Sequence, residues 1–307
     1  MPIRIAIIGY GKIARDQHVP SIAADPRFDL VAVASRNQRS DEVPSFTDHR
    51  EMIERMAGQI DAVALCTPPT ARVDIARDCL AAGLHLLLEK PPAATLGEID
   101  AIARLAAAAG RTLFATWHSQ HAAGVAAAGE ALAGEKIRSL DIRWHEDVRK
   151  WHPGQEWIWA PGGFGVFDPG INALSIATRI LPMRLFVRSA DLVYPANRQT
   201  PIAARIHFAG DQGTLCADFD WRCSEGESWT IRVETSGGKI VELLDGGARL
   251  TLNGEPRKLP VQGEYPALYA HFARLIEAGA SDVDKEPLRI VADSFLVGSR
   301  SLDEPFD

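Results

Sequence analysis

The fold is decided by an apolar run that ends in a glycine-rich turn, Ile5-Ala6-Ile7-Ile8-Gly9-Tyr10-Gly11-Lys12-Ile13-Ala14. The spacing Gly-x-Gly-x-x-Ala between a strand-like and a helix-like segment is typical of a nucleotide-binding turn. Gly9 permits the tight turn, Gly11 leaves the backbone accessible to a pyrophosphate, and Ala14 allows close packing of the helix on the strand. The amides of the helix N-terminus would then face the phosphates. The alternative is a turn that binds nothing, and the flanking strand and helix favour the nucleotide site.

Length, charge and cysteine content restrict the class of protein. A chain of 307 residues with 46% hydrophobic residues favours two domains. A formal charge of -7 argues against nucleic acid or an anionic membrane as the main partner, and the apolar runs are too short to span a membrane. No secretory segment and no Cys-x-x-Cys pair is evident, so we expect a cytoplasmic protein with four reduced core thiols, Cys66, Cys79, Cys216 and Cys223.

Residues 1–118 alternate apolar, strand-like runs with helix-like stretches. This alternation predicts an α/β fold with a doubly wound parallel sheet, the Rossmann architecture, because strands covered on both faces are apolar throughout. The predicted strands are Ile3–Ile8, Leu30–Ser35, Ala62–Cys66, His85–Glu89 and Thr112–Thr116.

Residues 119–307 show longer strand-like runs joined by short turns, which predict an α+β domain with a large open, mainly antiparallel sheet. Two helices are expected near the end of the chain, Pro266–Glu277 and Pro287–Ser301. The predicted strands are Ile137–Trp144, Leu185–Tyr194, Ile202–Phe208, Thr214–Asp220, Trp229–Thr235 and Lys239–Leu244.

The end of the second strand indicates which cofactor is bound. An acidic residue there would read the ribose 2′-hydroxyl of NAD, but this strand ends in Ser35 followed by Arg36. The guanidinium of Arg36 suits a 2′-phosphate, so we expect NADP to be preferred and NAD to be usable. In the alternative interpretation, Ser35 and Arg36 only begin a surface turn and do not read the 2′-phosphate.

The sequence Glu89-Lys90-Pro91 follows the fourth predicted strand. Lys90 therefore lies at the carboxyl edge of the sheet, where ligands of such folds bind. Its ammonium can stabilise a developing oxyanion, or, if desolvation makes the side chain a neutral amine, Lys90 can accept a proton, while Glu89 can orient Lys90 or balance its charge. Taken alone, a strand-end lysine is more often a surface charge.

A second candidate is the segment from Gly162 to Asn172. Asp168 before Pro169 is typical of a helix start, so Asp168 is interpreted either as an N-cap or as a ligand group. Asn172 lies one turn further on the same face, and the upstream glycines would allow close approach of a substrate.

A third candidate is the tryptophan-rich loop from Glu146 to Trp159. Aromatic faces beside a carboxylate and an imidazole suit a sugar, and this reading applies to Glu146, Trp151 and His152. We interpret Trp157 and Trp159 as core residues. The histidines show no metal-ligand spacing, so no metal site is predicted.

Together these motifs resemble the glucose-fructose oxidoreductase/inositol dehydrogenase (Gfo/Idh/MocA) family, and the resemblance spans both domains. The motifs are the glycine turn with its continuation to Pro20, Glu89-Lys90-Pro91 and Asp168-x-Gly170. Glu146–Trp159 and Phe167–Asn172 further resemble the family's L-arabinose 1-dehydrogenase and D-galactose 1-dehydrogenase branch. Much of the family carries histidine where this chain has Asn172, and an asparagine cannot shuttle a proton.

The resemblance implies NAD(P)⁺-dependent oxidation of the anomeric carbon of an aldopyranose, L-arabinose or D-galactose, to the aldonolactone. It implies that Lys90, Asp168 and Asn172 gather around the anomeric hydroxyl, with Asp168 or Lys90 as the base. The residues implied to hold the remaining sugar ring are Glu146, His152, Trp151, His118 and Trp229. The cofactor-binding residues expected are Gly9, Gly11, Lys12, Ile13, Ser35, Arg36, Thr67, Pro68, Glu89 and Lys90.

Two alternatives stay open. The chain could oxidise another sugar or a cyclitol, or it could be a dinucleotide-binding sensor without catalysis, because a fold does not fix a function. Retention of Lys90 and Asp168 favours the enzyme. The open sheet of the family implies a homodimer.

Overall fold

The computed structural model describes residues 1–210, 213–261 and 263–307, which form two compact units. The first contains Met1–His118 and Gly263–Lys285, and the second contains Ser119–Gln262 and Glu286–Asp307. The sequence-based boundary also lies at His118, but the second predicted domain included residues 263–285. Among the described residues, no helix combines the length and apolar character that a membrane span requires.

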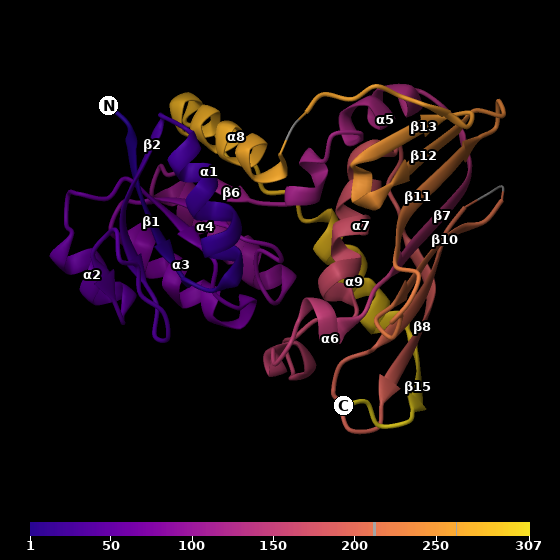
Figure 1. Cartoon of the computed structure of the whole chain (residues 1–307), viewed down its shortest axis with the longest axis horizontal. Helices are drawn as coiled ribbons and strands as arrows, with labels where there is room; N and C mark the ends of the chain where they lie inside the picture. Colours follow the sequence, from indigo (N-terminus) through magenta and orange to yellow (C-terminus); the bar gives the residue numbers. More distant parts are fainter. Residues whose placement is uncertain (211–212, 262) are drawn as a thin grey trace. The chain divides into compact units, whose positions relative to one another are not determined.

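The first unit contains a six-stranded parallel sheet of order β3-β2-β1-β4-β5-β6 (Figure 1). This order is that of a doubly wound Rossmann sheet, so the predicted fold class is confirmed. The predicted strands agree with the observed ones to within two residues, and only the short β3 was not predicted. The strands are β1 (Ile3–Ile8), β2 (Phe28–Ala34), β3 (Ser45–Phe46), β4 (Ala62–Leu65), β5 (His85–Leu88) and β6 (Leu113–Ala115).

Helices connect these strands, and two of them begin at side-chain caps. Asp48 accepts from the amides of Arg50 and Glu51 at the start of α2, and Thr95 and Glu98 form a capping box at the start of α4. A helical run follows the glycine turn, first as π-turns and then as regular helix. The helices are η1 (Ala14–His18), α1 (Val19–Ala24), α2 (His49–Arg55), η2 (Pro69–Ala71), α3 (Arg72–Ala81) and α4 (Leu96–Ala108).

Helix α8 (Glu264–Ala278) belongs to the first unit because its apolar face completes that unit's core. Leu268 and Phe272 are fully buried in one cluster with Phe28 of β2 and Ile5 of β1. The apolar period of α8 was predicted correctly, but periodicity does not indicate which core a helix joins. Residues 263–285 therefore pack apart from the rest of the predicted second domain.

The second unit is built on a nine-stranded sheet of order β14-β13-β12-β11-β7-β10-β9-β8-β15. Most neighbours are antiparallel, as predicted, but β7 pairs with β10 and β8 with β15 in parallel. The strands are β7 (Ile137–His145), β8 (Val187–Pro195), β9 (Ala203–Phe208), β10 (Leu215–Asp220), β11 (Ser228–Thr235), β12 (Ile240–Leu244), β13 (Arg249–Leu252), β14 (Glu255–Pro256) and β15 (Ser299–Asp303).

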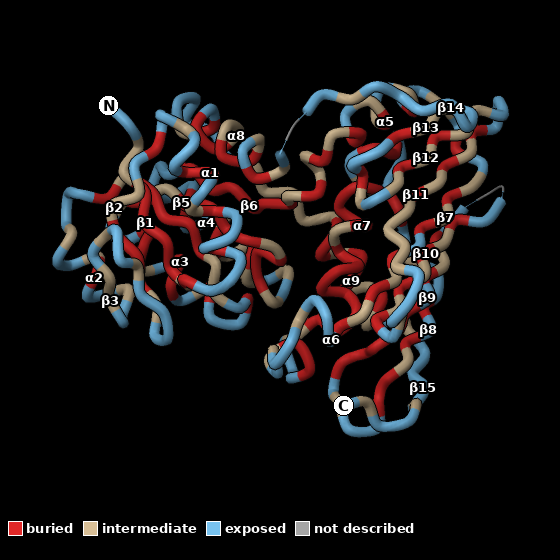
Figure 2. The backbone as a smooth tube through the Cα atoms, viewed as in Figure 1, coloured by how far each residue is buried: buried red, intermediate tan, exposed pale blue. Residues whose placement is uncertain are grey.

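The last predicted helix was too long. Helix α9 spans Glu286–Val297, and residues 299–303 form strand β15, which extends the sheet beside β8. The other helical segments of this unit are η3 (His118–His121, shared with the first unit), α5 (Val125–Leu132), α6 (Val148–Trp151), η4 (Glu156–Trp159), α7 (Phe167–Ile180) and η5 (Asp245–Gly247). Figure 2 shows α7 buried along most of its length.

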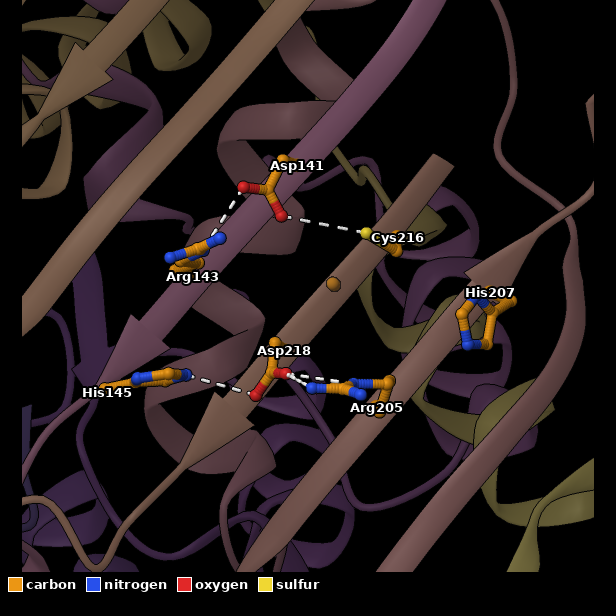
Figure 3. Close-up of a pocket in the computed structure, with 8 residues that line it drawn as sticks. Asp141, Arg143, His145, Arg205, His207, Cys216 and Asp218 are labelled. Carbon is orange, nitrogen blue, oxygen red and sulfur yellow. Dashed lines mark hydrogen bonds and ion pairs between the residues drawn. The ribbon is translucent and has the colours of Figure 1, made fainter. Parts of the chain in front are cut away.

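One face of the large sheet carries charged rather than apolar side chains. On β7, Leu140 and Ile142 are buried, whereas Asp141 and Arg143 point to the other face, as period-two alternation requires. This face contains a shallow hollow of about 400 Å³ (Figure 3). In it, Asp218 pairs with both Arg205 and His145.

Candidate active site

The glycine turn lies where the carboxyl ends of β1, β2 and β4 meet. The Gly9 amide donates to the carbonyl of Ala34 at 2.9 Å. Gly9 has φ of +94°, and a Cβ there would lie 2.7 Å from the backbone of Cys66 and Thr67. A side chain at this position would therefore strain the turn and strike the neighbouring strand. A Cβ on Gly11 would meet no described atom within 4 Å, which leaves the amide end of the helix accessible.

Thr67 supports a ligand at this edge. Its buried Oγ1 has no hydrogen-bond partner among the described residues. An orphaned buried hydroxyl costs free energy unless a bound group satisfies it. The bare Gly11 and the orphaned Thr67 both fit the dinucleotide predicted from the sequence, which the Gly9–Lys12 turn would hold by its phosphates.

The remaining predicted cofactor residues surround this turn. Ser35 follows β2 and donates its amide to the Phe46 carbonyl at 2.8 Å, and Arg36 beside it is exposed. Lys12 is exposed and pairs with Asp16, Ile13 is 40% exposed, and Pro68 precedes η2. Arg36 is thus accessible to a 2′-phosphate.

Arg72 was missed by the sequence-based prediction. It is 2% exposed at the start of α3 and donates to the carbonyls of Thr67, Glu89 and Pro91. One guanidinium thus joins the segments that follow β4 and β5. A lone arginine at a helix start gives no sequence signal for such a role.

Glu89 lies at the end of β5 and is 3% exposed. Its carboxylate accepts from the Tyr265 hydroxyl and from the Lys90 amide, and it lies 3.3 Å from Nε2 of His18. Burial opposes ionisation, but the hydrogen bond and charge of His18, the charge of His118 and the Tyr265 hydroxyl hold the pKa of Glu89 well below its usual range. The carboxylate of Glu89 therefore contacts the protein interior, and its predicted role in binding the cofactor stays a prediction.

His118 also lies in the first unit. Its Nδ1 is 2.6 Å from a carboxylate oxygen of Glu264, and its ring stacks on Tyr265 at 5.4 Å. The sequence had associated His118 with sugar binding. The structure adds that a carboxylate orients its ring.

The capping interpretation of Asp168 is wrong. Helix α7 begins at Phe167 with Val166 at its N-cap position, and no side chain caps it. Asp168 is therefore inside the first turn, 3% exposed, and its Oδ2 lies 3.5 Å from Nε2 of His152. Asn172 is half-buried one turn further along α7.

The glycines before Asp168 are explained by packing. A Cβ on Gly163 would lie 2.4 Å from the Trp157 carbonyl, and one on Gly165 would lie 2.3 Å from the Pro201 carbonyl. The predicted close approach of a substrate is therefore not needed to explain them. Close approach of the chain to itself already requires glycine at both positions.

Glu146 is a buried carboxylate held by two indoles. Trp221 Nε1 donates to Oε1 at 3.1 Å, and Trp229 Nε1 donates to Oε2 at 3.0 Å. Glu146 follows β7 and Trp221 follows β10, and these parallel strands end side by side. Trp221 was missed because that pairing could not be predicted from the sequence.

Trp151 and His152 end the short helix α6. Trp151 is 43% exposed, donates its indole N–H to Glu227 at 2.7 Å and meets Trp229 edge-on. The His152 ring lies 5.3 Å from the Trp221 ring. As predicted, Trp159 is buried, while Trp157 is half-buried. Of the four free cysteines, Cys79 is buried and the others are half-buried.

The second unit thus brings together Glu146, His152 and Asp168, with Asn172 one turn beyond Asp168. The first unit brings the glycine turn, Thr67 and the segment before Lys90 to one edge of its sheet. The first unit's group is assembled from segments distant in sequence, whereas the four residues of the second unit lie between positions 146 and 172.

Comparison with known proteins agrees with this architecture. Residues 3–117 match the Gfo/Idh/MocA oxidoreductase family, which has an NAD-binding Rossmann fold. Galactose 1-dehydrogenase from Pseudomonas fluorescens is 47% identical over 307 residues, covering 99% of each protein. The crystal structure of D-galactose-1-dehydrogenase from Rhizobium etli has a TM-score of 0.94 and 50% identity, covering 100% of this chain and 98% of that chain.

A more distant structure shares the fold alone. A 3-ketoreductase from Actinomadura kijaniata, crystallised with NADP and TDP-benzene, has a TM-score of 0.85 and 18% identity, covering 99% of this chain and 100% of that chain. The full-length similarity to galactose 1-dehydrogenase confirms the resemblance predicted from the motifs. The chain therefore belongs to the Gfo/Idh/MocA family of oxidoreductases.

Proposed function

We propose that this protein is an NAD(P)⁺-dependent aldose 1-dehydrogenase that oxidises D-galactose and L-arabinose at the anomeric carbon. The observation that carries the proposal is the polar cluster of the second unit. Glu146 and Asp168 are buried carboxylates at a site rich in tryptophan, and Asp168 lies inside the first turn of α7 and not at its N-cap position. The relatives named galactose 1-dehydrogenase support this substrate class.

The reaction removes a hydride from C1 and a proton from the anomeric hydroxyl, and the C1–O bond becomes the lactone carbonyl. A dinucleotide held by the Gly9–Lys12 turn would supply the hydride acceptor. The chain's own residues must bind the sugar, orient C1 and accept the proton.

Lys90 and Asp168 are the two candidate bases. The ammonium of Lys90 would stabilise the oxygen as its proton leaves, and either group could accept that proton. Asn172 can donate and accept hydrogen bonds but cannot carry a proton, so we assign it the orientation of the hydroxyl. The proposal leaves the base open between Lys90 and Asp168.

The ring hydroxyls are assigned to Glu146 and His152, with His118 as a further polar contact. Trp229 and Trp151 offer aromatic faces for the C–H face of the ring. Because two indoles already hold Glu146, it is preorganised to accept a hydroxyl at one position. A sugar that is epimeric at that position leaves a desolvated acceptor unpaired.

We also propose that NADP is preferred over NAD, because Arg36 is exposed beside the glycine turn and no acidic residue follows β2. The charged, open face of the large sheet supports the expectation of a homodimer. Its mixed signs allow Asp–Arg pairs between two copies. Light scattering of the purified protein tests the dimer.

A substrate panel tests the function. Purified protein is mixed with each sugar and each cofactor, and reduced nicotinamide is followed by absorbance. We expect turnover with D-galactose and L-arabinose, much slower turnover with D-glucose, and faster rates with NADP. Reduction of neither cofactor with these sugars would refute the proposal. Turnover with an inositol alone would favour the cyclitol alternative, and cofactor binding without turnover would favour the sensor.

A further inference from the structure

A buried polar network lies beneath Lys90 and connects three distant segments of the first unit. Glu89 follows β5, His18 ends η1, and Tyr265 and Tyr269 lie one turn apart on α8. His18 is 0% exposed, and both tyrosines are buried. The sequence motifs associated Glu89 with Lys90, but gave no role to His18, Tyr265 or Tyr269.

The contacts of the network satisfy both oxygens of Glu89. Oε1 accepts from the Tyr265 hydroxyl and lies 3.3 Å from His18 Nε2, while Oε2 accepts from the Lys90 amide. The other ring nitrogen of His18 lies 2.7 Å from the Tyr269 hydroxyl. The carboxylate thus links the buried histidine to the main chain of Lys90.

The electrostatics favour a charged His18–Glu89 pair. Burial lowers the pKa of His18, but Cys66, Tyr269 and Glu89 together raise it well above its usual value. Burial and Glu89 raise the pKa of Tyr265 well above 10, so Tyr265 remains a neutral donor. A buried carboxylate with a cation and a hydroxyl as partners is stable as an ion.

The main chain on either side of Lys90 is therefore fixed by two charged groups. Glu89 accepts the Lys90 amide on one side, and Arg72 donates to the carbonyls of Glu89 and Pro91. A base or an oxyanion stabiliser must be held within fractions of an ångström of its productive position. A main chain fixed in this way holds the Cα of Lys90, from which the side chain extends, in a defined position.

We propose that the His18–Glu89 pair, closed by Tyr265, positions Lys90 for its part in the reaction. His18, Glu89 and Tyr265 are then positioning residues that act through the Lys90 main chain. This inference rests on the proposed function insofar as Lys90 takes part in sugar oxidation.

Two matched variants on α8 separate positioning from general stability. Tyr265→Phe removes the donor to Glu89, whereas Tyr269→Phe removes the same hydroxyl from a contact with His18 only. We expect Tyr265→Phe to lower kcat about tenfold, because it removes a hydrogen-bond donor from the charged Glu89, and to leave the KM for NADP nearly unchanged. Tyr269→Phe should lower kcat less.

A second readout does not depend on turnover. The full-length protein is treated with a limiting amine-reactive reagent at several pH values, and modification of Lys90 is quantified by mass spectrometry. Lys285, which is paired with Asp100, serves as the internal reference. We expect the extent of Lys90 modification relative to Lys285 to change in Tyr265→Phe and in His18→Gln, and to stay near the wild-type profile in Tyr269→Phe.

The two readouts distinguish the possible failures. If Tyr265→Phe melts earlier but keeps the wild-type kcat per folded molecule and the wild-type Lys90 profile, the network is structural and the inference is overturned. If the wild-type protein oxidises no sugar, the proposed function fails, and the modification profile still decides whether Lys90 is positioned by Glu89. Should His18→Gln fail to fold, the two tyrosine variants decide the matter.

Discussion

Replacing Asp168 by asparagine separates catalysis from helix stability. Asp168 is 3% exposed in the first turn of α7, and Val166, not Asp168, occupies the N-cap position of that helix. Asparagine has nearly the same shape but cannot accept a proton at neutral pH. The variant therefore removes a candidate base and changes little of the packing.

The expected loss of rate is much larger than the expected loss of stability. A general base contributes about 100- to 10,000-fold to the rate, so kcat should fall within that range if Asp168 accepts the proton. The stability term is the interaction of a carboxylate with the helix N-terminus, about 0.3–2 kcal/mol. In a protein of this size such a change lowers Tm by only a few degrees, roughly 2–4 °C per kcal/mol.

A true N-cap aspartate provides the matched control. Asp48 accepts from the amides of Arg50 and Glu51 at the start of α2. Asp48→Ala should cost about 1 kcal/mol of unfolding free energy and leave kcat unchanged, the opposite pattern to Asp168→Asn. Both variants are compared by steady-state kinetics with D-galactose and NADP and by urea unfolding.

One result would refute the argument for Asp168. If Asp168→Asn keeps kcat within about threefold of the wild type, its carboxylate is not the base, and Lys90 remains as the acceptor. If its activity falls only in proportion to the unfolded fraction, Asp168 serves the fold alone.

Four further outcomes follow from the same contacts. Lys90→Met should abolish turnover while the Kd for NADP, measured by fluorescence titration, changes only a few-fold; wild-type-like turnover would remove Lys90 from the mechanism. Arg36→Ala should raise the Kd for NADP far more than the Kd for NAD in the same titration, and equal losses of affinity would show that Arg36 does not read the 2′-phosphate. Glu146→Gln should lower the ratio of kcat/KM for D-galactose to kcat/KM for D-glucose. An unchanged ratio would exclude Glu146 as the group that distinguishes the two sugars. In the folded protein the pKa of Glu89 is lowered and the pKa of His18 is raised, so the pair should stabilise the fold fully between the ordinary values of 4.5 and 6.5. This stabilisation should be lost as pH falls below 4.5 or rises through the raised pKa of His18. Urea unfolding of His18→Gln should therefore lack the loss of stability at alkaline pH, and a loss like that of the wild type would contradict the pairing.

The strands of both sheets were predictable where burial makes them apolar. β1 matches its predicted range in full, and β4 and β5 are each one residue shorter than predicted. β15 was missed because its residues Ser299–Ser301 are exposed and polar at the edge of the sheet. An edge strand of this kind has main-chain pairing on one side and no apolar signal.

The candidate site was predictable residue by residue, but its contacts were not. Asp168 before Pro169 satisfies the sequence rule for a capped helix, yet the helix begins at Phe167 because it enters the buried core at that point. Trp221 and Glu146 are 75 residues apart and meet only because β7 and β10 pair in parallel. Local patterns cannot specify such pairings.

Helix α8 shows where more could have been inferred. Tyr265, Tyr269 and Phe272 lie on one buried face of α8. Phe272 shows that this face accommodates an aromatic ring without a hydroxyl, whereas Tyr265 and Tyr269 each bury a hydroxyl as well. A buried hydroxyl without a partner costs free energy, so two tyrosines on a core-facing stripe predict polar groups in the core they cover. In the first unit the polar groups that meet these hydroxyls are His18 and Glu89. Helix α8 therefore contacts Glu89, the residue preceding Lys90, in addition to covering apolar surface.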